Sequence, residues 1–582
     1  MRDGLDLGGA YGATLGRIKG QGGERAKLGM AAMMWISHSR RPLQAEEICR
    51  AIGIRIGSND FDNDDAPAIS TLLGCCQGLA TIEKGTSTVR LIHFTLQEYL
   101  CTHPDLFDRA HSTIAETCLT YLNFQHAKDI SAGSSSHPLG APFLEYSSLY
   151  WGTHMRIELS DRAKSLALQL VGQFNGHISA KILSESIAGE VTRRIYPRPS
   201  IPDCERFSAL HCISYFGMVE VVRILINMGR WDLNQGDGLG VTPLIWAAMY
   251  GHEEVVGVLL QEKQVQPDRQ DADDGRAALS WAAEKGHEGI VKLLLGQQDV
   301  NPDPPETKYN QTPLLWAAQN GHEGIVKLLL WRKDVNPDTP CRHYDRTPLS
   351  WAAENGHEGI VKLLLGRKDV NPDSSSSYGR SPLSLAGEKG HEGIVKLLLG
   401  RKDVNPVTPD TLYGRTPLSW AANQGHEGVV KLLLERKVVN PDTPDTHYGR
   451  TPLLRAANKG HEGIVRLLLG RKEVNPDTPE TKHGRTPLLS AAMHGHEGIV
   501  KLLLGRKEVN PDTPDMYNGL TPLSWAAAGG YEGIVKLLLE RKDVNPNSSN
   551  KYDQTPLTLA TQYKKYRVVE LLQARIADIP GN

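Results

Sequence analysis

Histidine and glutamate stand side by side at a recurring position of this sequence, and such a pair opens the HExxH motif of zinc peptidases. The eight histidines of this column are His252, His287, His322, His357, His391, His426, His461 and His496. The second histidine of the zinc motif never follows. Neighbouring copies would stand about 8–10 Å apart in packed helices, too far to share one metal ion. We therefore expect the imidazoles to cap and pack between helices, in preference to forming a metal site or a proton relay.

Cysteine and phosphate chemistry are equally sparse. The eight cysteines have neither the density of a disulfide framework nor paired CxxC spacing, so we expect reduced thiols. Cys204, His211 and Cys212 form the cluster that most suggests a metal, but no second CxxC or HxxxH pair accompanies it. The sequence also lacks a GxxxxGK[ST] phosphate loop, a GxGxxG after a strand and a GxSxG nucleophile elbow. It therefore predicts no catalytic residue, no metal and no cofactor, and a protein that is not an enzyme.

Tyrosine and arginine form two further columns, each just ahead of a Thr-Pro or Ser-Pro pair. These residue types are the ones most enriched at protein-binding hot spots. The candidate partner-binding residues are therefore Tyr344, Tyr378, Tyr413, Tyr448, Arg346, Arg380, Arg415, Arg450 and Arg485. The alternative is that these side chains are solvated or pack within their own loop, and the residue types alone leave both open.

The element that positions these columns is a repeated unit, present in eleven copies at a spacing of 34 or 35 residues. A Thr-Pro marker or a variant of it opens the copies at Ser208, Thr242, Ala277, Thr312, Thr347, Ser381, Thr416, Thr451, Thr486, Thr521 and Thr555. In the copy that begins at Thr416, the hydroxyl can cap a helix that starts at Pro417 and ends at Gly425. A second helix starts near Glu427, and the turn formers of residues 439–450 predict an extended finger.

Such a unit cannot bury both of its helices alone, so the copies must stack into a solenoid. The pattern TPL-x-x-AA-x-x-GH-x-x-(I/V)V-x-LLL, followed by DVN, closely resembles the ankyrin repeat over residues 205–578. The resemblance implies a curved stack of helix pairs that binds other proteins along its concave side and its fingers. The histidine of the family's TPLH pattern survives only as His211. Tryptophan replaces the usual leucine in six copies, where we expect it to pack in the core.

The residues before the array lack the repeat and predict a different domain. Helices are expected over residues 26–36, 43–52 and 68–76, strands over 79–82 and 88–94, and a closing helix over 95–100. Three helices and a hairpin describe a winged helix. The third helix contains no lysine or arginine, which a helix in the DNA major groove needs for phosphate and guanine contacts. We therefore expect this domain to pack on protein and to bind no nucleic acid.

The segments WISHSRRPLQAEEICRAI and STVRLIHFTLQEYL resemble the winged-helix region that follows the nucleotide-binding module of NACHT-type signalling ATPases. The resemblance is greatest to the NACHT–ankyrin (NLR-like) proteins of filamentous fungi, and it covers about residues 10–125. It implies that His93, in the IHFTLQEYL motif, approaches the nucleotide of a separate NTPase module. A histidine that merely ends a strand is the alternative. On this resemblance, the chain is the C-terminal half of such a protein without its NTPase module.

Composition fits a protein of the cytoplasm. The 65 basic residues nearly balance the 67 acidic ones, so the chain as a whole offers no field that would attract nucleic acid or an anionic membrane. No apolar run approaches the roughly 18 residues of a membrane span, and residues 1–20 lack the apolar core of a signal peptide.

The sequence therefore predicts a mainly α protein: a solenoid of about eleven helix pairs with long fingers, preceded by a winged-helix-like α+β domain and a helical connector. The expected boundaries are 1–24 for a linker, 25–125 for the winged helix, 126–204 for the connector, 205–578 for the repeats and 579–582 for a tail. The expected function is a protein-recognition scaffold, the sensor half of a NACHT-type signalling protein. The alternative is an adaptor that recruits substrates to a ubiquitin ligase or a kinase assembly.

Overall fold

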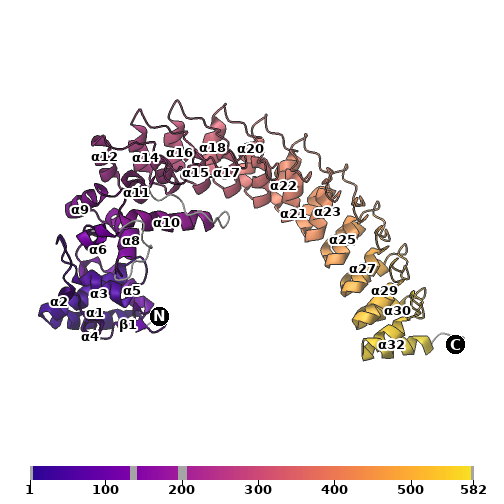
Figure 1. The fold of residues 1–582 in the computed structure, drawn as a ribbon. Coiled ribbons are helices and arrows are strands. Elements are labelled where there is room, and N and C mark those ends of the chain that lie inside the picture. Colours follow the sequence, from indigo (N-terminus) through magenta and orange to yellow (C-terminus); the bar gives the residue numbers. More distant parts are fainter. Residues whose placement is uncertain (1–3, 131–140, 194–205, 578–582) are drawn as a thin grey trace. The chain divides into compact units, whose positions relative to one another are not determined.

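The computed structural model of this chain describes residues 4–130, 141–193 and 206–577 (Figure 1). The chain divides into two compact units, residues 1–301 and 302–582. Within the described residues the strands form a single two-stranded sheet, and all other regular elements are helices. No helix of the described segments is long and apolar enough to cross a lipid bilayer.

The N-terminal part of the first unit is the winged helix that the sequence predicts. Its elements are α1 (Gly4–Gly20), α2 (Gly23–His38), α3 (Ala45–Gly53), η1 (Asn63–Asp65), α4 (Ile69–Cys75), β1 (Ala80–Glu83), β2 (Thr88–Leu91), α5 (Phe94–Thr102) and η2 (Pro104–Leu106). The two strands pair antiparallel, with Ala80 opposite Leu91. Trp35, Ile48 and Leu72 bring one buried side chain each from α2, α3 and α4 into a common core.

Helix α1 replaces the linker that the sequence suggested for residues 1–24. Six glycines among residues 4–20 lower the intrinsic helix propensity of this segment. However, Tyr11, Leu15 and Ile18 lie on one helical face and are buried. The Tyr11 hydroxyl is also 2.8 Å from Oγ1 of Thr95 at the start of α5. Tertiary packing therefore stabilises a helix that local propensity disfavours.

A helical connector joins the winged helix to the repeats. Its helices are α6 (Ala110–Leu122), α7 (Gln125–Asp129), α8 (Leu144–Ile157), α9 (Asp161–Val171) and α10 (Ile178–Arg193). Helix α8 packs on α6 and also on the first repeat, where the Trp151 ring meets the Phe216 ring edge-on at 5.2 Å. A Cβ on Gly152 would lie 2.2 Å from the Phe216 ring, so only glycine permits this approach. The connector thus covers the first face of the repeat stack.

Residues 206–577 form eleven helix pairs, the number that the sequence predicts. The pairs are α11 (Ala209–Phe216) and α12 (Val219–Asn227); α13 (Pro243–Met249) and α14 (Glu253–Leu260); α15 (Ala278–Lys285) and α16 (Glu288–Leu295); α17 (Pro313–Asn320) and α18 (Glu323–Trp331); α19 (Pro348–Asn355) and α20 (Glu358–Leu365); α21 (Pro382–Lys389) and α22 (Glu392–Gly400); α23 (Pro417–Gln424) and α24 (Glu427–Leu434); α25 (Pro452–Lys459) and α26 (Glu462–Leu469); α27 (Pro487–His494) and α28 (Glu497–Leu504); α29 (Pro522–Gly529) and α30 (Glu532–Glu540); α31 (Pro556–Gln562) and α32 (Tyr566–Ala577). We number the repeats 1 to 11 in this order, and each finger belongs to the repeat whose first helix follows it.

Repeat 7 shows why the sequence folds in this way. The Thr416 hydroxyl accepts the Ser419 N–H at 3.2 Å, Pro417 opens α23, and Gly425 ends it at a φ of 89°. Nε2 of His426 then lies 2.8 Å from the Glu388 carbonyl of repeat 6. A Cβ on Gly390 would come within 2.4 Å of this imidazole. The histidine column is therefore a set of inter-repeat hydrogen bonds, and the glycine before each histidine makes room for the next one.

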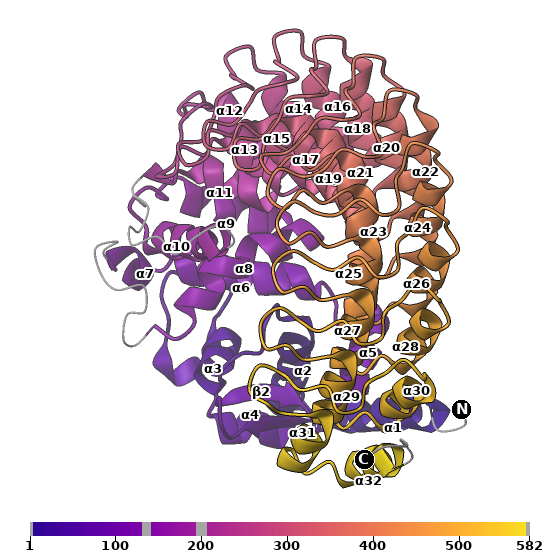
Figure 2. The same ribbon diagram turned by 90° about the vertical axis from the view of Figure 1, so that its right-hand side faces the viewer.

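In the second unit the elements form three layers (Figure 2). The first helices stack on one another, as α21, α23 and α25 do, and the second helices stack beside them. The fingers lie along the free side of the first helices. The surface that the second unit presents beside its fingers is therefore made of finger residues and of the ends of the first helices.

Candidate functional site

The fingers of the second unit form a fixed surface because each is bonded to the next. The Thr446 N–H donates to the Tyr413 carbonyl at 3.0 Å, and the Thr481 N–H donates to the Tyr448 carbonyl at 2.8 Å. On the other strand of the finger, the Asn475 N–H donates to the Asp442 carboxylate at 3.2 Å. The carbonyls of Tyr344 and Tyr378 accept the same bond, from Ser377 and Thr411, so all four predicted tyrosines form part of one hydrogen-bonded ladder.

In repeats 2, 3, 7, 8 and 10 a buried aspartate fixes the finger to the first helix of its repeat. In repeat 7, Asp410 accepts the indole N–H of Trp420 at 3.0 Å and the Tyr413 N–H at 2.6 Å. The same aspartate–tryptophan bond occurs in repeats 2, 3 and 10, as Asp237–Trp246, Asp271–Trp281 and Asp515–Trp525. Trp246, Trp281 and Trp420 are buried, as expected from the sequence, whereas Trp316, Trp351 and Trp525 are half-buried. The sequence analysis missed the bond between tryptophan and the finger. Its signal is an aspartate nine or ten residues before the tryptophan.

The predicted tyrosines and arginines lie close together in this surface. The Arg415 guanidinium carbon is 4.5 Å from the centre of the Tyr413 ring and 4.5 Å from that of the Trp420 ring. The stacking distance is 5.1 Å for Arg346 on Tyr344 and 4.7 Å for Arg450 on Tyr448. The Arg380 guanidinium lies 4.4 Å from the centre of the Trp420 ring. Most of these side chains are half-buried, and Tyr378 is 46% exposed. Packing within the fingers and an accessible edge therefore coexist.

Carboxylates neutralise three of the five predicted arginines. Arg346 pairs with Glu354 and Arg380 pairs with Glu388, in each case eight residues further along the chain. Arg450 pairs with Glu480, a buried residue of the next finger. Arg415 and Arg485 form no ion pair within the described part of the chain.

His93, the predicted nucleotide-approaching residue, caps helix α5. Its Nδ1 accepts the Thr95 N–H at 3.2 Å and is 2.8 Å from the Thr95 hydroxyl. The imidazole is exposed, as are its neighbours Ile92, at 51%, and Phe94, at 75%. An exposed imidazole between two exposed apolar side chains is a surface that another domain can cover.

The structure groups no metal ligands in the residues it describes, since no three His, Cys, Asp or Glu side chains come together there. Cys204 lies outside the described residues. His211 is fully buried, with its Nε2 2.8 Å from the Gln235 carbonyl, and burial lowers its pKa to about 4. Cys212 is buried as well, and burial raises its thiol pKa. Both residues are core groups of repeat 1.

A histidine network links helices α6 and α8 of the first unit. Nδ1 of His111 on α6 is 2.8 Å from Nδ1 of His154 on α8, and Nε2 of His154 is 2.9 Å from the Tyr146 hydroxyl. Burial lowers the pKa of His111 to about 4 and that of His154 to about 3. These imidazoles are therefore neutral at physiological pH and hold the connector together by hydrogen bonds.

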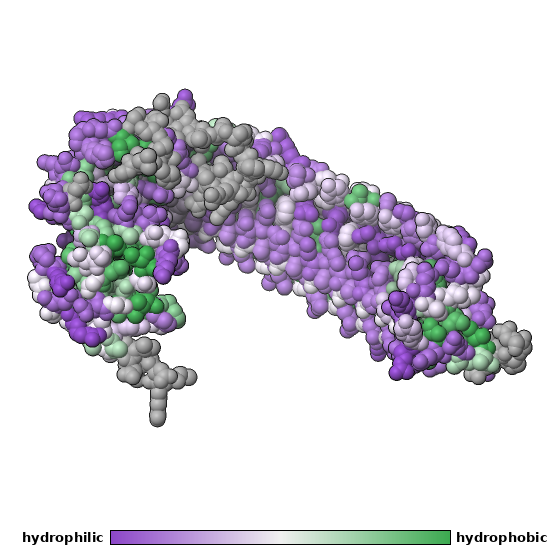
Figure 3. All heavy atoms as spheres, turned by 60° about the horizontal axis from the view of Figure 1, so that its bottom comes forward, coloured by the Kyte–Doolittle hydropathy of each residue, from purple (hydrophilic) through white to green (hydrophobic). Residues whose placement is uncertain are grey.

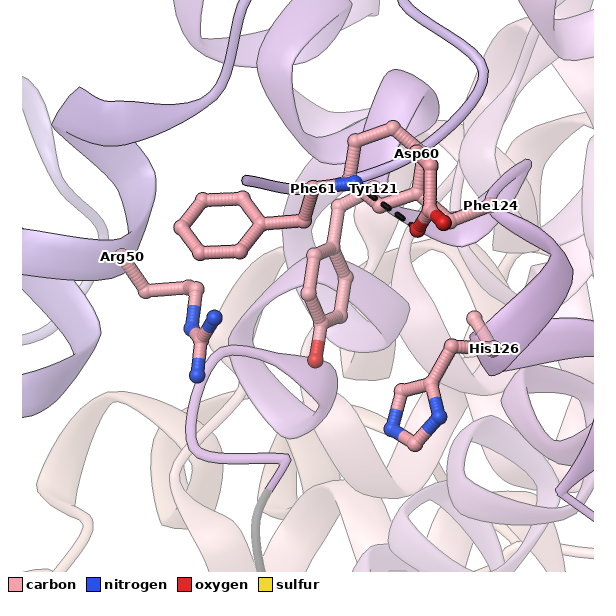
Figure 4. Close-up of a pocket in the computed structure, with 7 residues that line it drawn as sticks. Arg50, Asp60, Phe61, Tyr121, Phe124 and His126 are labelled. Atoms are coloured by element: carbon pink, nitrogen blue, oxygen red, sulfur yellow. Dashed lines mark hydrogen bonds between the residues drawn. The ribbon is translucent and has the colours of Figure 1, made fainter. Parts of the chain in front are cut away.

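A pocket of about 260 Å³ lies beside α3 and α6 (Figure 4). The Arg50 guanidinium covers the Phe61 ring at 4.2 Å, and the Asp60 carboxylate accepts the Phe61 N–H at 2.8 Å. Burial raises the pKa of Tyr121 to about 12, so its phenol is a hydrogen-bond donor and not a base. Among the described lining residues nothing pairs a nucleophile with a general base.

In Figure 3 the visible face of the repeats is mostly hydrophilic, and hydrophobic side chains gather over the N-terminal domain and near the C-terminal end. Exposed large apolar side chains do occur singly on the repeats, such as Trp331 at 87% and Leu412 at 51%. Polar and charged groups therefore dominate what a partner of the array would meet.

Comparison with known families identifies the repeats. The description "Ankyrin repeats (3 copies)" matches residues 175–271, 264–341, 332–410, 349–445, 401–480, 418–515 and 506–580. The chain belongs to the ankyrin-repeat family. The ankyrin array carries the fingers and first helices described above.

Three further comparisons were made. Residues 18–119 match the winged helix domain of GPI inositol-deacylase, in agreement with the three helices and hairpin of the fold. A crystal structure of the human ASB11 ankyrin repeat domain is similar to this chain, with 27% identity over 41% of this chain and 100% of that one, at a TM-score of 0.36. No curated protein matches the chain.

Proposed function

We propose that this chain is a non-enzymatic scaffold of the cytoplasm that binds other proteins along the concave side and the fingers of its ankyrin array. The observation that carries this proposal is the row of fingers in the second unit, which backbone hydrogen bonds and buried Asp–Trp bonds hold in place. Such a surface loses little conformational entropy when a partner binds, because its side chains are already ordered. The candidate contacts remain the tyrosines Tyr344, Tyr378, Tyr413 and Tyr448 and the five finger arginines.

We further propose that the array is the sensor half of a NACHT-type signalling protein, with domains at residues 25–125, 126–204 and 205–578. The support is the winged helix next to the array and the exposed group of Ile92, His93 and Phe94 at the start of α5. In this proposal a separate NTPase module covers Ile92, His93 and Phe94. The chain itself binds no cofactor, metal ion, membrane or nucleic acid.

The experiment is affinity capture with the full chain from an extract of the source organism, followed by mass spectrometry. The variant Phe94→Ala, which removes an exposed ring, is compared with the wild type. We expect a phosphate-loop NTPase among the captured proteins that is depleted with Phe94→Ala, whereas partners of the array are unchanged. Ubiquitin-ligase or kinase subunits in place of an NTPase would support the adaptor alternative. Capture of no protein by the array would refute the scaffold function.

A further inference from the structure

The finger arginines fall into two classes, according to whether a glutamate lies eight residues further along the chain. The repeats are nearly identical, so the two classes can be compared directly. In repeats 3, 5 and 6, the arginine pairs with a glutamate eight residues further on, at the end of the first helix: Arg276–Glu284, Arg346–Glu354 and Arg380–Glu388. These six side chains are 5–19% exposed, so each is a largely buried and internally neutral pair. Arginines of this class have little charge left for a partner.

Repeats 7, 8 and 9 keep the arginine and lose the glutamate. The arginines are Arg415, Arg450 and Arg485, and the residues eight positions on are Asn423, Asn458 and Met493. Arg450 turns to Glu480, the carboxylate of the next finger. For Arg415 and Arg485, no side-chain nitrogen has a hydrogen-bond acceptor among the described residues, and the Nε atom of each is buried. Burial lowers the pKa of the half-buried Arg415 guanidinium, although the charges of Asp445 and Asp410 raise it, so an additional acceptor would stabilise its charged form.

Repeat 8 adds a fourth guanidinium to the same surface. Arg455 occupies the position at which other repeats have tryptophan, and it is 3% exposed. Its guanidinium forms an ion pair with the buried Asp445 carboxylate. Its Nη1 reaches the Asn423 amide oxygen of repeat 7 at 3.5 Å. Burial lowers the pKa of Arg455, and the neighbouring charge of Arg415 lowers it further. The guanidiniums of repeats 7 and 8 are thus close enough to repel one another.

The balance of charge in this segment is positive. The finger and first-helix residues of repeats 7 to 9, at 404–424, 439–459 and 474–494, carry six cations, namely Arg415, Arg450, Arg455, Lys459, Lys482 and Arg485, and five carboxylates, namely Asp410, Asp442, Asp445, Asp477 and Glu480. Asp410, Asp445 and Glu480 are each at least 97% buried and bonded to Trp420, Arg455 and Arg450, respectively. Asp442 and Asp477 are half-buried and accept the backbone N–H groups of Asn475 and Asn510. Lys459 and Lys482 are exposed. A partner would therefore meet the exposed cations Lys459 and Lys482, and the counter-charges nearest the surface are the half-buried Asp442 and Asp477.

We propose that this surface binds an acidic peptide segment of a partner protein, with aspartate or glutamate carboxylates seated on Arg415 and Arg485. The proposal rests on the scaffold function proposed above and names its partner class. Arginine binds carboxylates with two parallel hydrogen bonds, and stacking on Tyr413 and Trp420 holds the Arg415 fork in a fixed plane. Two repeats separate the two arginines, which corresponds to about 20 Å at helix-packing distances. An extended peptide spans this with carboxylates about six residues apart.

The probe is a fluorescein-labelled peptide of about twelve glycine and serine residues that carries two Glu-Glu pairs, about six residues apart. Its binding to the full chain is measured by fluorescence anisotropy at an ionic strength of about 50 mM, where charge interactions are weakly screened. We expect Arg415→Gln/Arg485→Gln to weaken binding at least about tenfold, which corresponds to about 1.4 kcal/mol. The matched control Arg276→Gln/Arg367→Gln changes two arginines that pair with Glu284 and Asp369 and lie outside the candidate contacts, and it should leave affinity unchanged. Circular dichroism checks that both variants keep the wild-type helix content.

Three results would overturn the proposal: no binding of the Glu peptide, equal binding by both double variants, or equal binding of a peptide with Gln in place of Glu. Binding of a phosphoserine version alone would also overturn it, because the site would then be specific for phosphate. Any of these results leaves the scaffold function standing if the array still captures proteins. Loss of all protein capture, in contrast, would refute the scaffold function itself.

Discussion

Repeat 6 contains a glycine that the structure does not need, and replacing it should stabilise the array. Gly387 lies inside α21, at a position where repeats 2 to 5 and 7 to 10 have alanine. A Cβ there would lie 3.5 Å from the Pro417 carbonyl oxygen and 3.8 Å from Cγ1 of Val429, which are ordinary van der Waals contacts. Alanine gains about 1 kcal/mol over glycine in a helix interior, and a buried methyl group adds up to about 0.8 kcal/mol. We therefore expect Gly387→Ala to stabilise the array by about 1–2 kcal/mol.

The assay is amide hydrogen exchange of the full chain, together with its thermal unfolding. Exchange of α21 and α22 should slow, because opening of these helices costs more free energy. The control is Gly390→Ala on the same helix end, where φ is 80° and the Cβ would lie 2.4 Å from the His426 ring. This variant should lose at least about 1–2 kcal/mol through backbone strain. Faster exchange in Gly387→Ala would show that α21 and α23 pack more closely than described and would refute the reasoning.

Three other perturbations follow from the same contacts. Asp410→Ala removes the acceptor of the Trp420 indole and of two backbone N–H groups, so urea unfolding should show a loss of about 2–3 kcal/mol. Val407→Asp restores the carboxylate that other fingers offer to the next asparagine N–H, and exchange of the Asn440 amide should slow about fivefold. Acid should lower the stability of the first unit. The reason is that burial lowers the pKa of four histidines to about 4, below the unfolded value of 6.5; these are His111, His177, His211 and His252. Their contribution to stability is present above pH 6.5 and is lost as the pH falls toward 4, so exchange in residues 206–260 should accelerate over that range.

Much of the fold was predictable because short local sequence signals specify the helices of each repeat. The Thr416 cap, Pro417 and the left-handed Gly425 specify a short helix without reference to the rest of the chain. The winged helix was predictable for the same reason, and its helices differ from the prediction only by a few residues at their ends. Helix α1 was not predictable from propensity, since its glycines disfavour a helix. The burial of Tyr11, Leu15 and Ile18 and the hydrogen bond of Tyr11 to Thr95 stabilise it.

The candidate site was predictable in its residue types and not in its charges. The sequence placed arginine and tyrosine on the fingers, and the structure brings them together. The recurrence of arginine in the sequence does not reveal which arginines are paired. Glu354 and Glu388 neutralise two of them, whereas Asn423 leaves Arg415 without a carboxylate at the equivalent position. That distinction depends on contacts between a finger and the end of the next helix. The spacing of eight residues becomes meaningful only once these elements are placed.

The most direct test of the protein-binding surface is to locate where a bound acidic peptide lies. A photo-crosslinking version of the Glu peptide is bound to the full chain, irradiated, and mapped by mass spectrometry. We predict cross-links to the fingers and first helices of repeats 7 to 9, within residues 410–424, 445–459 and 480–494. Cross-links that fall instead on the matching residues 341–355 of repeat 5, or on the winged helix at residues 18–119, would contradict the assignment.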